Sequence, residues 1–246
     1  MELLHIFDML PSTNDHAKLL AKQGAPHGTA VLAKRQSAGR GRMGRTFLSP
    51  EGGLYLSVIL RPSESAEELM ALTTVLAAAA CPVLEEVAGL TVEIKWTNDL
   101  VVRGKKLAGI LTELSLKPDG RVDFAVCGIG VNCNTRMEDL DPEIREMATS
   151  LLAETGMVTD VEQLARKLAE ALATAALQMG NSTWLEDYRR RCVTLGKQVR
   201  VLGQVPYEAE ALDVDAQGAL VVRKADGSLE RIFSGEVSVR GLWGYV

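Results

Sequence analysis

The most apolar run of the chain, Leu69–Leu84, places the strongest limit on its fold. The run has no charged residue, but its sixteen residues fall short of the roughly 18–20 that a membrane-spanning helix needs. It also contains Pro82. We therefore expect a buried helix from about Ser65 to Val87, with the rest of the chain forming a core around it.

The composition agrees with such a core and excludes one class of function. Of the 246 residues, 47% are hydrophobic and 24% are charged, which is typical of a globular protein without long disordered segments. The net charge of −5 and the pI near 5.4 argue against a protein whose whole surface binds nucleic acid. A local basic patch is still allowed.

The N-terminus and the cysteines indicate a cytoplasmic protein. Glu2 and Asp8 stand where a secretion signal would be basic and then apolar, so no export is expected. The cysteines have no C-x-x-C spacing, and all three histidines lie at the other end of the chain, so no metal site is predicted. We expect free thiols at Cys81, Cys127, Cys133 and Cys192.

Strand and helix patterns alternate in the first half of the chain and predict a mixed α/β core. The polar run Pro11–Asn14 offers capping residues for a helix over Asp15–Gln23, and Arg35–Gly53 is expected to be a loop. Strands are expected at Leu3–Met9, Thr29–Lys34, Leu54–Leu60, Val92–Trp96, Leu100–Val102, Leu107–Ser115 and Val122–Ile129.

The residue pattern changes twice in the second half of the chain. Asp141–Arg191 has a helical pattern, and these helices are expected to pack on one face of the sheet. After Gly196, short alternating strands separated by glycine-containing turns indicate a small antiparallel barrel. We therefore expect two domains, 1–191 and 192–246, with a boundary near Cys192.

The expected loop contains the most unusual segment, Gln36–Arg45, with three arginines among three glycines. Glycine lets a backbone approach an anion closely, and arginine forms bidentate contacts with carboxylate or phosphate. The segment matches neither the dinucleotide fingerprint nor a P-loop, because no helix and no G-K-S/T follow. By itself it fits a nucleotide site, a solvated basic loop or an RNA-binding Arg-Gly stretch.

Two further segments carry polar residues at strand ends. Lys95–Asp99 is followed by Lys105–Glu113, although a lysine at a strand start is commonly only a surface residue. Gly128–Asn132 ends a strand with two glycines and an asparagine that could contact a purine, but taken alone it is more typical of a plain turn.

Together, five segments in order resemble the biotin–protein ligase family across nearly the whole chain. They are Ser12-Thr13-Asn14, then GRGRMGR, KWTND, KKLAGILTE and GIGVN. The segment Gly235–Arg240 is also similar to the end of that family's small domain. The resemblance implies an α+β fold: a mixed sheet with packed helices, a biotin/lipoate ligase-like catalytic domain, and then a small SH3-like β-barrel.

The resemblance also implies a role for each matching residue. Ser12, Thr13 and Asn14 match the polar floor for the biotin ureido ring, and Gln36, Gly39, Arg40 and Gly41 match the stretch that closes over biotin. Catalytic roles are implied for Arg42 and Lys106, at the phosphate and at the biotin carboxylate. The remaining matches in the binding site are Arg45 at phosphate, Asn132 at adenine, Phe47, Lys95, Asn98 and Gly109.

The implied substrates are biotin and ATP with Mg²⁺, for which Asp99 is a candidate contact. The implied partner is a biotin carboxyl carrier protein, with no DNA or membrane and a possible homodimer. Only eleven residues precede Ser12, so we expect the form of the enzyme without a DNA-binding domain. Two departures from the family pattern are Thr97 in place of proline and Phe47 in place of tryptophan. The alternatives are a lipoate–protein ligase and an RNA-binding module.

Overall fold

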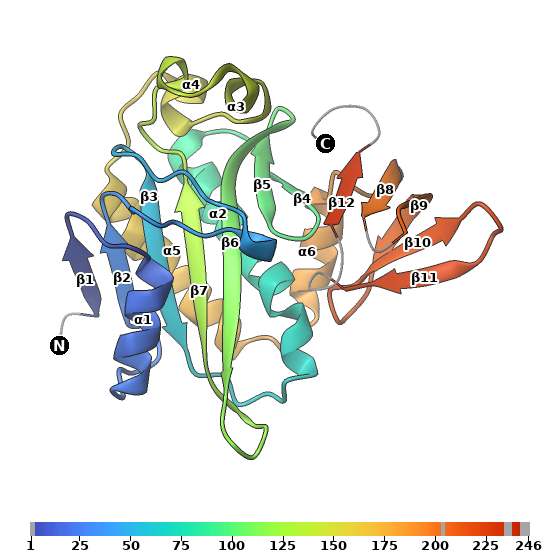
Figure 1. Cartoon of the computed structure of the whole chain (residues 1–246), viewed down its shortest axis with the longest axis horizontal. Helices are drawn as coiled ribbons and strands as arrows, with labels where there is room; N and C mark the ends of the chain where they lie inside the picture. The colour runs from blue at the N-terminus through green and yellow to red at the C-terminus, as the bar shows by residue number, and fades with distance from the viewer. Residues whose placement is uncertain (1–2, 203–204, 234–237, 242–246) are drawn as a thin grey trace.

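A seven-stranded mixed sheet forms the centre of the computed structural model, which describes residues 3–202, 205–233 and 238–241 (Figure 1). Its order is β1-β2-β3-β7-β6-β5-β4; β1 and β2 are parallel, and every other neighbouring pair is antiparallel. The strands are β1 (Leu4–Phe7), β2 (Ala30–Ala33), β3 (Leu54–Leu60), β4 (Glu93–Lys95), β5 (Asp99–Val102), β6 (Lys105–Leu116) and β7 (Val122–Val131).

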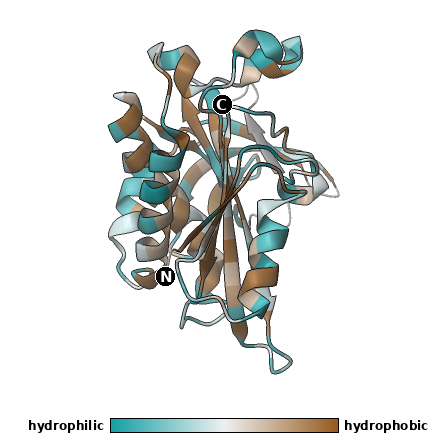
Figure 2. Ribbon diagram, turned by 90° about the vertical axis from the view of Figure 1, so that its left-hand side faces the viewer, coloured by the Kyte–Doolittle hydropathy of each residue, from teal (hydrophilic) through white to brown (hydrophobic). Residues whose placement is uncertain are grey.

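Helices cover the two faces of this sheet unequally. On the front face in Figure 1 lies one helix, α1 (Thr13–Lys22), whose N-terminus is capped by the Ser12 hydroxyl. The back face is covered by α2 (Leu72–Ala88), α5 (Val161–Leu177) and α6 (Thr183–Arg191). Figure 2 shows the resulting layers, with hydrophobic strands between helices whose outer sides are hydrophilic.

The apolar run forms the expected buried helix, in two parts. A 3₁₀ turn, η2 (Glu68–Ala71), leads directly into α2, which ends at Gly89 in the left-handed conformation. The combined segment Glu68–Ala88 is long and apolar enough to cross a membrane by length and composition, although its uncharged core Leu69–Leu84 is shorter than a membrane span. It packs instead against the sheet, α5 and α6, as the core helix of a globular domain does.

The helices expected over Asp141–Arg191 do not all cover one face. α5 and α6 do, but α3 (Pro142–Met147) and α4 (Leu151–Thr155) lie at the upper end of the sheet (Figure 1). The 3₁₀ turn η3 (Met137–Asp139) precedes the expected range. The physical reason is length and polarity. α3 has six residues and none of them is buried, so it cannot form part of a core layer.

In the described part of the C-terminal segment, the regular elements are all strands, as expected. β8 (Gln198–Leu202), β9 (Tyr207–Val214), β10 (Leu220–Lys224), β11 (Leu229–Ile232) and β12 (Ser238–Gly241) form an antiparallel sheet in the order β11-β10-β9-β8-β12. Its apolar face shares one continuous core with α2 and the central sheet. The boundary near Cys192 stays a prediction. Of the family-like segment Gly235–Arg240, residues 235–237 lie outside the described residues.

Candidate active site

The front face of the central sheet changes character along the strands. In its lower half Ile59, Phe124 and Val126 point forward and pack under α1. In its upper half the corresponding positions of β7 and β6 are Gly128, Gly130 and Gly109, which have no side chain. The upper half is therefore hollow, with the β2–β3 loop crossing in front of it (Figure 1).

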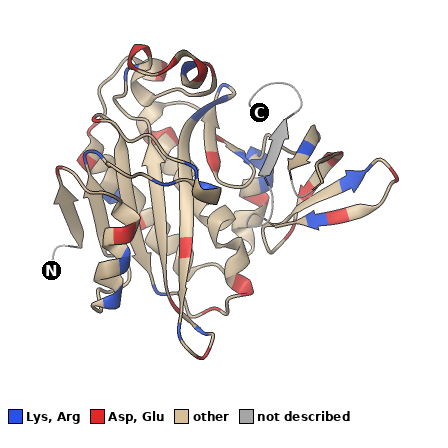
Figure 3. Ribbon diagram, viewed as in Figure 1, with Lys and Arg blue, Asp and Glu red and all other residues tan. Residues whose placement is uncertain are grey.

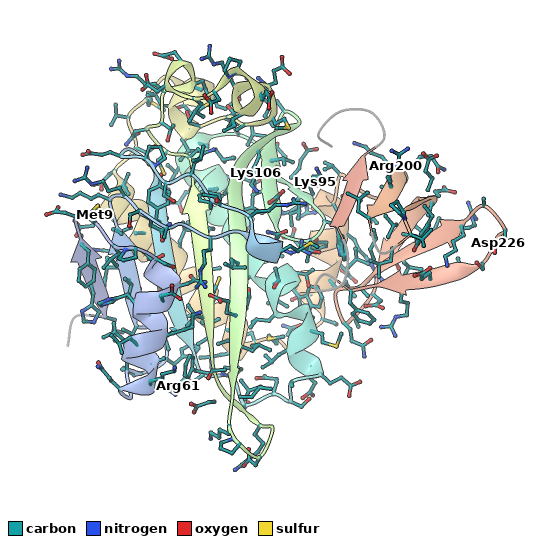
Figure 4. The ribbon with its side chains drawn as sticks, in the orientation of Figure 1. Met9, Arg61, Lys95, Lys106, Arg200 and Asp226 are labelled. Carbon is teal, nitrogen blue, oxygen red and sulfur yellow. The ribbon has the colours of Figure 1, made fainter. Side chains whose placement is uncertain are left out.

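The cavity in this hollow has a volume of about 790 Å³. All but one of the predicted site residues line it: Ser12, Thr13, Asn14, Gln36, Arg40, Gly41, Arg42, Arg45, Phe47, Lys95, Asn98, Asp99, Lys106, Gly109 and Asn132. Segments far apart in the chain thus meet at one site. Figure 4 shows Lys95 and Lys106 close together here, whereas Arg61 and Asp226 lie at distant ends of the molecule.

The plain-turn interpretation of Gly128–Asn132 is wrong. Gly128 and Gly130 lie within β7, opposite Leu111 and Gly109 of β6. A Cβ atom on Gly128 would lie 2.1 Å from the Asn14 Oδ1 atom, and one on Gly130 would lie 2.4 Å from the Phe47 ring. These glycines are required because two side chains of the site lie directly on the strand.

At one end of the cavity, polar side chains are joined in a hydrogen-bond network. The Gln36 Oε1 atom accepts from the Thr13 backbone N–H at 2.8 Å and from its hydroxyl at 3.0 Å. The fully buried Ser57 hydroxyl lies 2.8 Å from the Thr13 Oγ1 and 2.6 Å from the Asn14 Oδ1. Fixed donors and acceptors of this kind suit a neutral, polar ligand group.

At the other end, a β-bulge sets the direction of Lys106. Leu100 pairs with Ala108, but Val101 pairs with Lys106, so β6 has one extra residue. The shift places Lys106 on the same face as Gly109, with its Nζ atom 2.6 Å from the Asp99 Oδ1. Bulges commonly redirect a side chain beside an active site. Lys105 is exposed and points away.

The arginine-rich loop crosses this charged end; Figure 3 shows its basic segments in front of a mostly uncharged sheet. The Arg42 Nη1 atom donates a hydrogen bond to the Asn98 Oδ1 at 2.8 Å. The Asn98 Nδ2 in turn donates to the Ile110 carbonyl of β6. Burial lowers the pKa of Arg42. The negative charge of Asp99 raises it in part, and the positive charge of Arg45 lowers it further. An anionic ligand strongly stabilises a partly desolvated cation.

Gly39 is the predicted residue that does not line the cavity. It is buried under its own loop, where a Cβ atom would lie 2.4 Å from the Phe47 carbonyl oxygen and 2.5 Å from the Ser49 Oγ. Its place in the structure is to let the loop fold back on itself. Direct contact of Gly39 with a ligand therefore has no support from the geometry.

Phe47 and Asn132 line the cavity, and each is held in place by a contact with a neighbouring residue. Phe47 stands edge-on to Tyr55, with ring centroids 6.4 Å apart, and the Lys106 Nζ lies 5.9 Å from the Phe47 centroid. The Asn132 Nδ2 donates to the Thr149 carbonyl at 2.9 Å. The side chain is thereby held at the end of β7.

Several residues of the site were missed by the sequence analysis. Strand alternation predicts that Tyr55 and Ser57 share one face of β3, but only the pairing of β3 with β7 puts them on the same face as Gly128 and Gly130. Trp96 lines the cavity, and its Nε1 donates to the Gly218 carbonyl of the C-terminal sheet at 3.0 Å. No local signal in the sequence predicts that contact.

Comparison with known proteins places this architecture in a family. Residues 6–132 match the model of the Biotin/lipoate A/B protein ligase family, and residues 194–240 match the Biotin protein ligase C terminal domain. A bifunctional ligase/repressor of Bacillus subtilis is 35% identical over 94% of this chain and 72% of its own length. A biotin–[acetyl-CoA-carboxylase] ligase of Mycobacterium tuberculosis is 34% identical over 85% of this chain and 79% of its own length.

A solved structure agrees over nearly the whole chain. The biotin protein ligase of Aquifex aeolicus, in complex with biotin and ATP, superposes with a TM-score of 0.82 at 30% identity, covering 98% of this chain and 100% of that one. The fold and site thus define an ATP-dependent ligase of the biotin/lipoate class. Within that class, the chain belongs to the biotin–protein ligase family.

Proposed function

We propose that this ligase activates biotin as biotinyl-adenylate and transfers it to one lysine of a biotin carboxyl carrier protein of acetyl-CoA carboxylase. The names of the relatives from M. tuberculosis and Paracoccus denitrificans support that partner. The observation that carries the proposal is one cavity with a neutral polar network at one end and Lys106 and Arg42 at the other. A homodimer and a cytoplasmic setting stay predictions.

At the polar end, the proposed ligand group is the ureido ring of biotin. Its carbonyl oxygen needs a donor and its two N–H groups need acceptors. The hydroxyls of Ser12 and Thr13 and the amide of Asn14 can supply both kinds, and all three are at least nine-tenths buried. Gln36 holds Thr13 in place by accepting a hydrogen bond from its backbone N–H. Arg40 and Gly41 line the cavity on the side that the β2–β3 loop covers.

At the charged end, the carboxylate of biotin attacks the α-phosphate of ATP and pyrophosphate leaves. Negative charge concentrates on the phosphoryl oxygens in the transition state, and preorganised cations stabilise it. Lys106 is the proposed contact to both the carboxylate and the α-phosphate, and Arg42 and Arg45 are the proposed contacts to phosphate. Phe47 and Asn132 are proposed to hold adenine.

Magnesium would arrive with ATP rather than occupy a protein cage. Asp99 is the single carboxylate among the described residues that line the cavity, and it already pairs with Lys106. No cluster of three or more potential ligands occurs in the described part of the chain. This fits Mg²⁺, which commonly keeps water and phosphate ligands and takes only one or two carboxylates.

In the second step the amine of the acceptor lysine attacks the acyl carbon of biotinyl-adenylate, and AMP leaves with its phosphate. The mixed anhydride is sensitive to water, so the loop that covers the cavity protects it. This chain is not required to supply a nucleophile of its own. Its four cysteines are free and buried, away from solvent.

The direct test of this function is ATP-dependent mass transfer to an isolated carrier domain. With biotin, ATP and Mg²⁺, we expect the carrier to gain one biotinyl group and the solution to gain AMP and pyrophosphate. Lipoate in place of biotin serves as the control for the related ligase class. Transfer of lipoate at an equal or greater rate, or no transfer of biotin, would overturn the proposal.

Replacement of Arg42 by alanine is expected to leave the fold intact and to release biotinyl-adenylate more rapidly. Arg42 lies in a loop, so it adds little to stability, whereas charge-assisted hydrogen bonds to phosphate contribute about 1.5–3 kcal/mol. The expected readout is labelling of bystander lysines in an unrelated protein, measured by mass spectrometry. If R42A labels only the carrier, at the rate of the parent enzyme, its proposed role is wrong.

A further inference from the structure

Four charged side chains form a cluster beside the polar end of the cavity. Glu113 of β6 lies at its centre: its Oε1 is 2.8 Å from the Lys18 Nζ, and its Oε2 is 3.4 Å from an Arg40 nitrogen. Asp15 lies 2.5 Å from Arg40 and 3.2 Å from Lys18. The cluster joins α1, β6 and the arginine-rich loop, although of its members only Arg40 lines the cavity.

Glu113 also makes a contact that an ordinary surface ion pair would not make. Its Oε2 accepts from the Asn14 Nδ2 at 2.8 Å, and Asn14 is 5% exposed. Burial alone raises the pKa of Glu113, but hydrogen bonds from Lys18 and Asn14 and the charges of Lys18 and Arg40 lower it overall. The carboxylate is therefore ionised at neutral pH, and an ionised carboxylate can only accept hydrogen bonds.

The Asn14 amide nitrogen faces two acceptors, the Glu113 Oε2 at 2.8 Å and the Leu111 carbonyl at 3.4 Å, and the closer, charged one is the main determinant of which way the amide points. The amide nitrogen must face Glu113, so the amide oxygen faces Ser57 and lies over Gly128, which lines the cavity. The reversed amide would place its N–H₂ group there instead. A ligand N–H group, such as those of a cyclic urea, would then meet a donor in place of an acceptor.

The same carboxylate helps to hold the loop against the sheet. Arg40 is bound on two sides, by Asp15 of α1 and by Glu113 of β6. Both Arg40 and Asp15 are largely exposed, with side-chain exposures of 42% and 55%, so this contact is weak in water and can open. Glu113 is less exposed, at 26%, and it is the contact that joins Arg40 to the sheet.

We infer that Glu113 is a positioning residue for biotin, which orients the Asn14 amide toward the ureido ring and fastens the covering loop through Arg40. The inference rests on the proposed function, because it takes the Ser12–Asn14 end as the biotin site. Its two consequences can be separated, since orientation needs only an acceptor oxygen and fastening needs the negative charge.

The test compares Glu113→Ala with Glu113→Gln by calorimetric titration with biotin and with ATP. Loss of the acceptor is expected to weaken biotin binding by about 10- to 100-fold in E113A, with ATP binding changed less than about twofold. In E113Q the amide oxygen still accepts from Asn14, so biotin affinity is expected within about fivefold of the parent. Because the charge is lost, E113Q should release preformed biotinyl-adenylate faster, in a filter-binding assay.

Glu85→Gln is the matched control. The Glu85 side chain is 27% exposed against 26% for Glu113, and it pairs with Arg191 at 2.6 Å, away from the cavity lining. E85Q is expected to lower the melting temperature without changing biotin affinity. Equal losses of biotin and ATP binding in E113A, or parent-like adenylate release by E113Q, would overturn the inference. If E113A does not fold, the E113Q release rate decides. A parent enzyme that does not bind biotin would overturn the proposed function itself.

Discussion

Replacement of Lys106 by alanine is expected to slow adenylate formation by about 100- to 1,000-fold, the usual cost of removing one preorganised charge-stabilising group. Lys106 points into the cavity beside Asp99 and Phe47, where the carboxylate nucleophile and the α-phosphate are proposed to meet. Its loss removes a positive charge at the point where negative charge accumulates. Pyrophosphate release at saturating biotin and ATP measures the effect.

Lys105 provides the control for this experiment. It is adjacent in sequence, but its side chain is exposed and lies 3.4 Å from the Arg145 carbonyl, outside the cavity. K105A is therefore expected to be nearly silent, and circular dichroism would verify that both variants fold. Equal activities of the two variants, or a greater loss in K105A, would contradict the placement of the catalytic lysine.

Gly128→Ala is expected to weaken biotin binding by about 10- to 100-fold while ATP binding is retained, because two hydrogen bonds of the polar network are lost. The added methyl group would overlap the Asn14 Oδ1 at 2.1 Å. Asn14 would have to turn away and leave both Ser57 and Glu113. Separate titrations with biotin and ATP measure the contrast.

Gly180→Ala is the matched glycine variant. Gly180 has an ordinary φ, and among the described residues other than its two chain neighbours no atom lies within 4 Å of the position that the alanine Cβ would occupy. The same substitution there is expected to leave both affinities unchanged. Parent-like biotin affinity in G128A would show that Asn14 does not contact biotin, and equal losses for both ligands would indicate general damage to the sheet.

Much of this protein was predictable from local sequence patterns. The alternation in Leu54–Leu60 predicted a strand and the uncharged run Leu69–Leu84 predicted a buried helix, and both elements are confirmed. Burial of apolar residues at a fixed period is a local property, so it can be recognised without knowing the partners. Five ordered motifs likewise identified the family before any spatial arrangement was known.

How those motifs become a site depends on contacts between distant segments. The β-bulge that turns Lys106 rather than Lys105 into the cavity depends on the pairing of β6 with β5. The need for glycine at Gly128 depends on Asn14, which is distant in the chain. The contact between Glu113 and Asn14 joins residues 99 positions apart. The elements could be predicted from the sequence because their causes are local. The resemblance to the family also named most of the residues that line the cavity. The geometry of the site could not be predicted, because only packing brings these residues together.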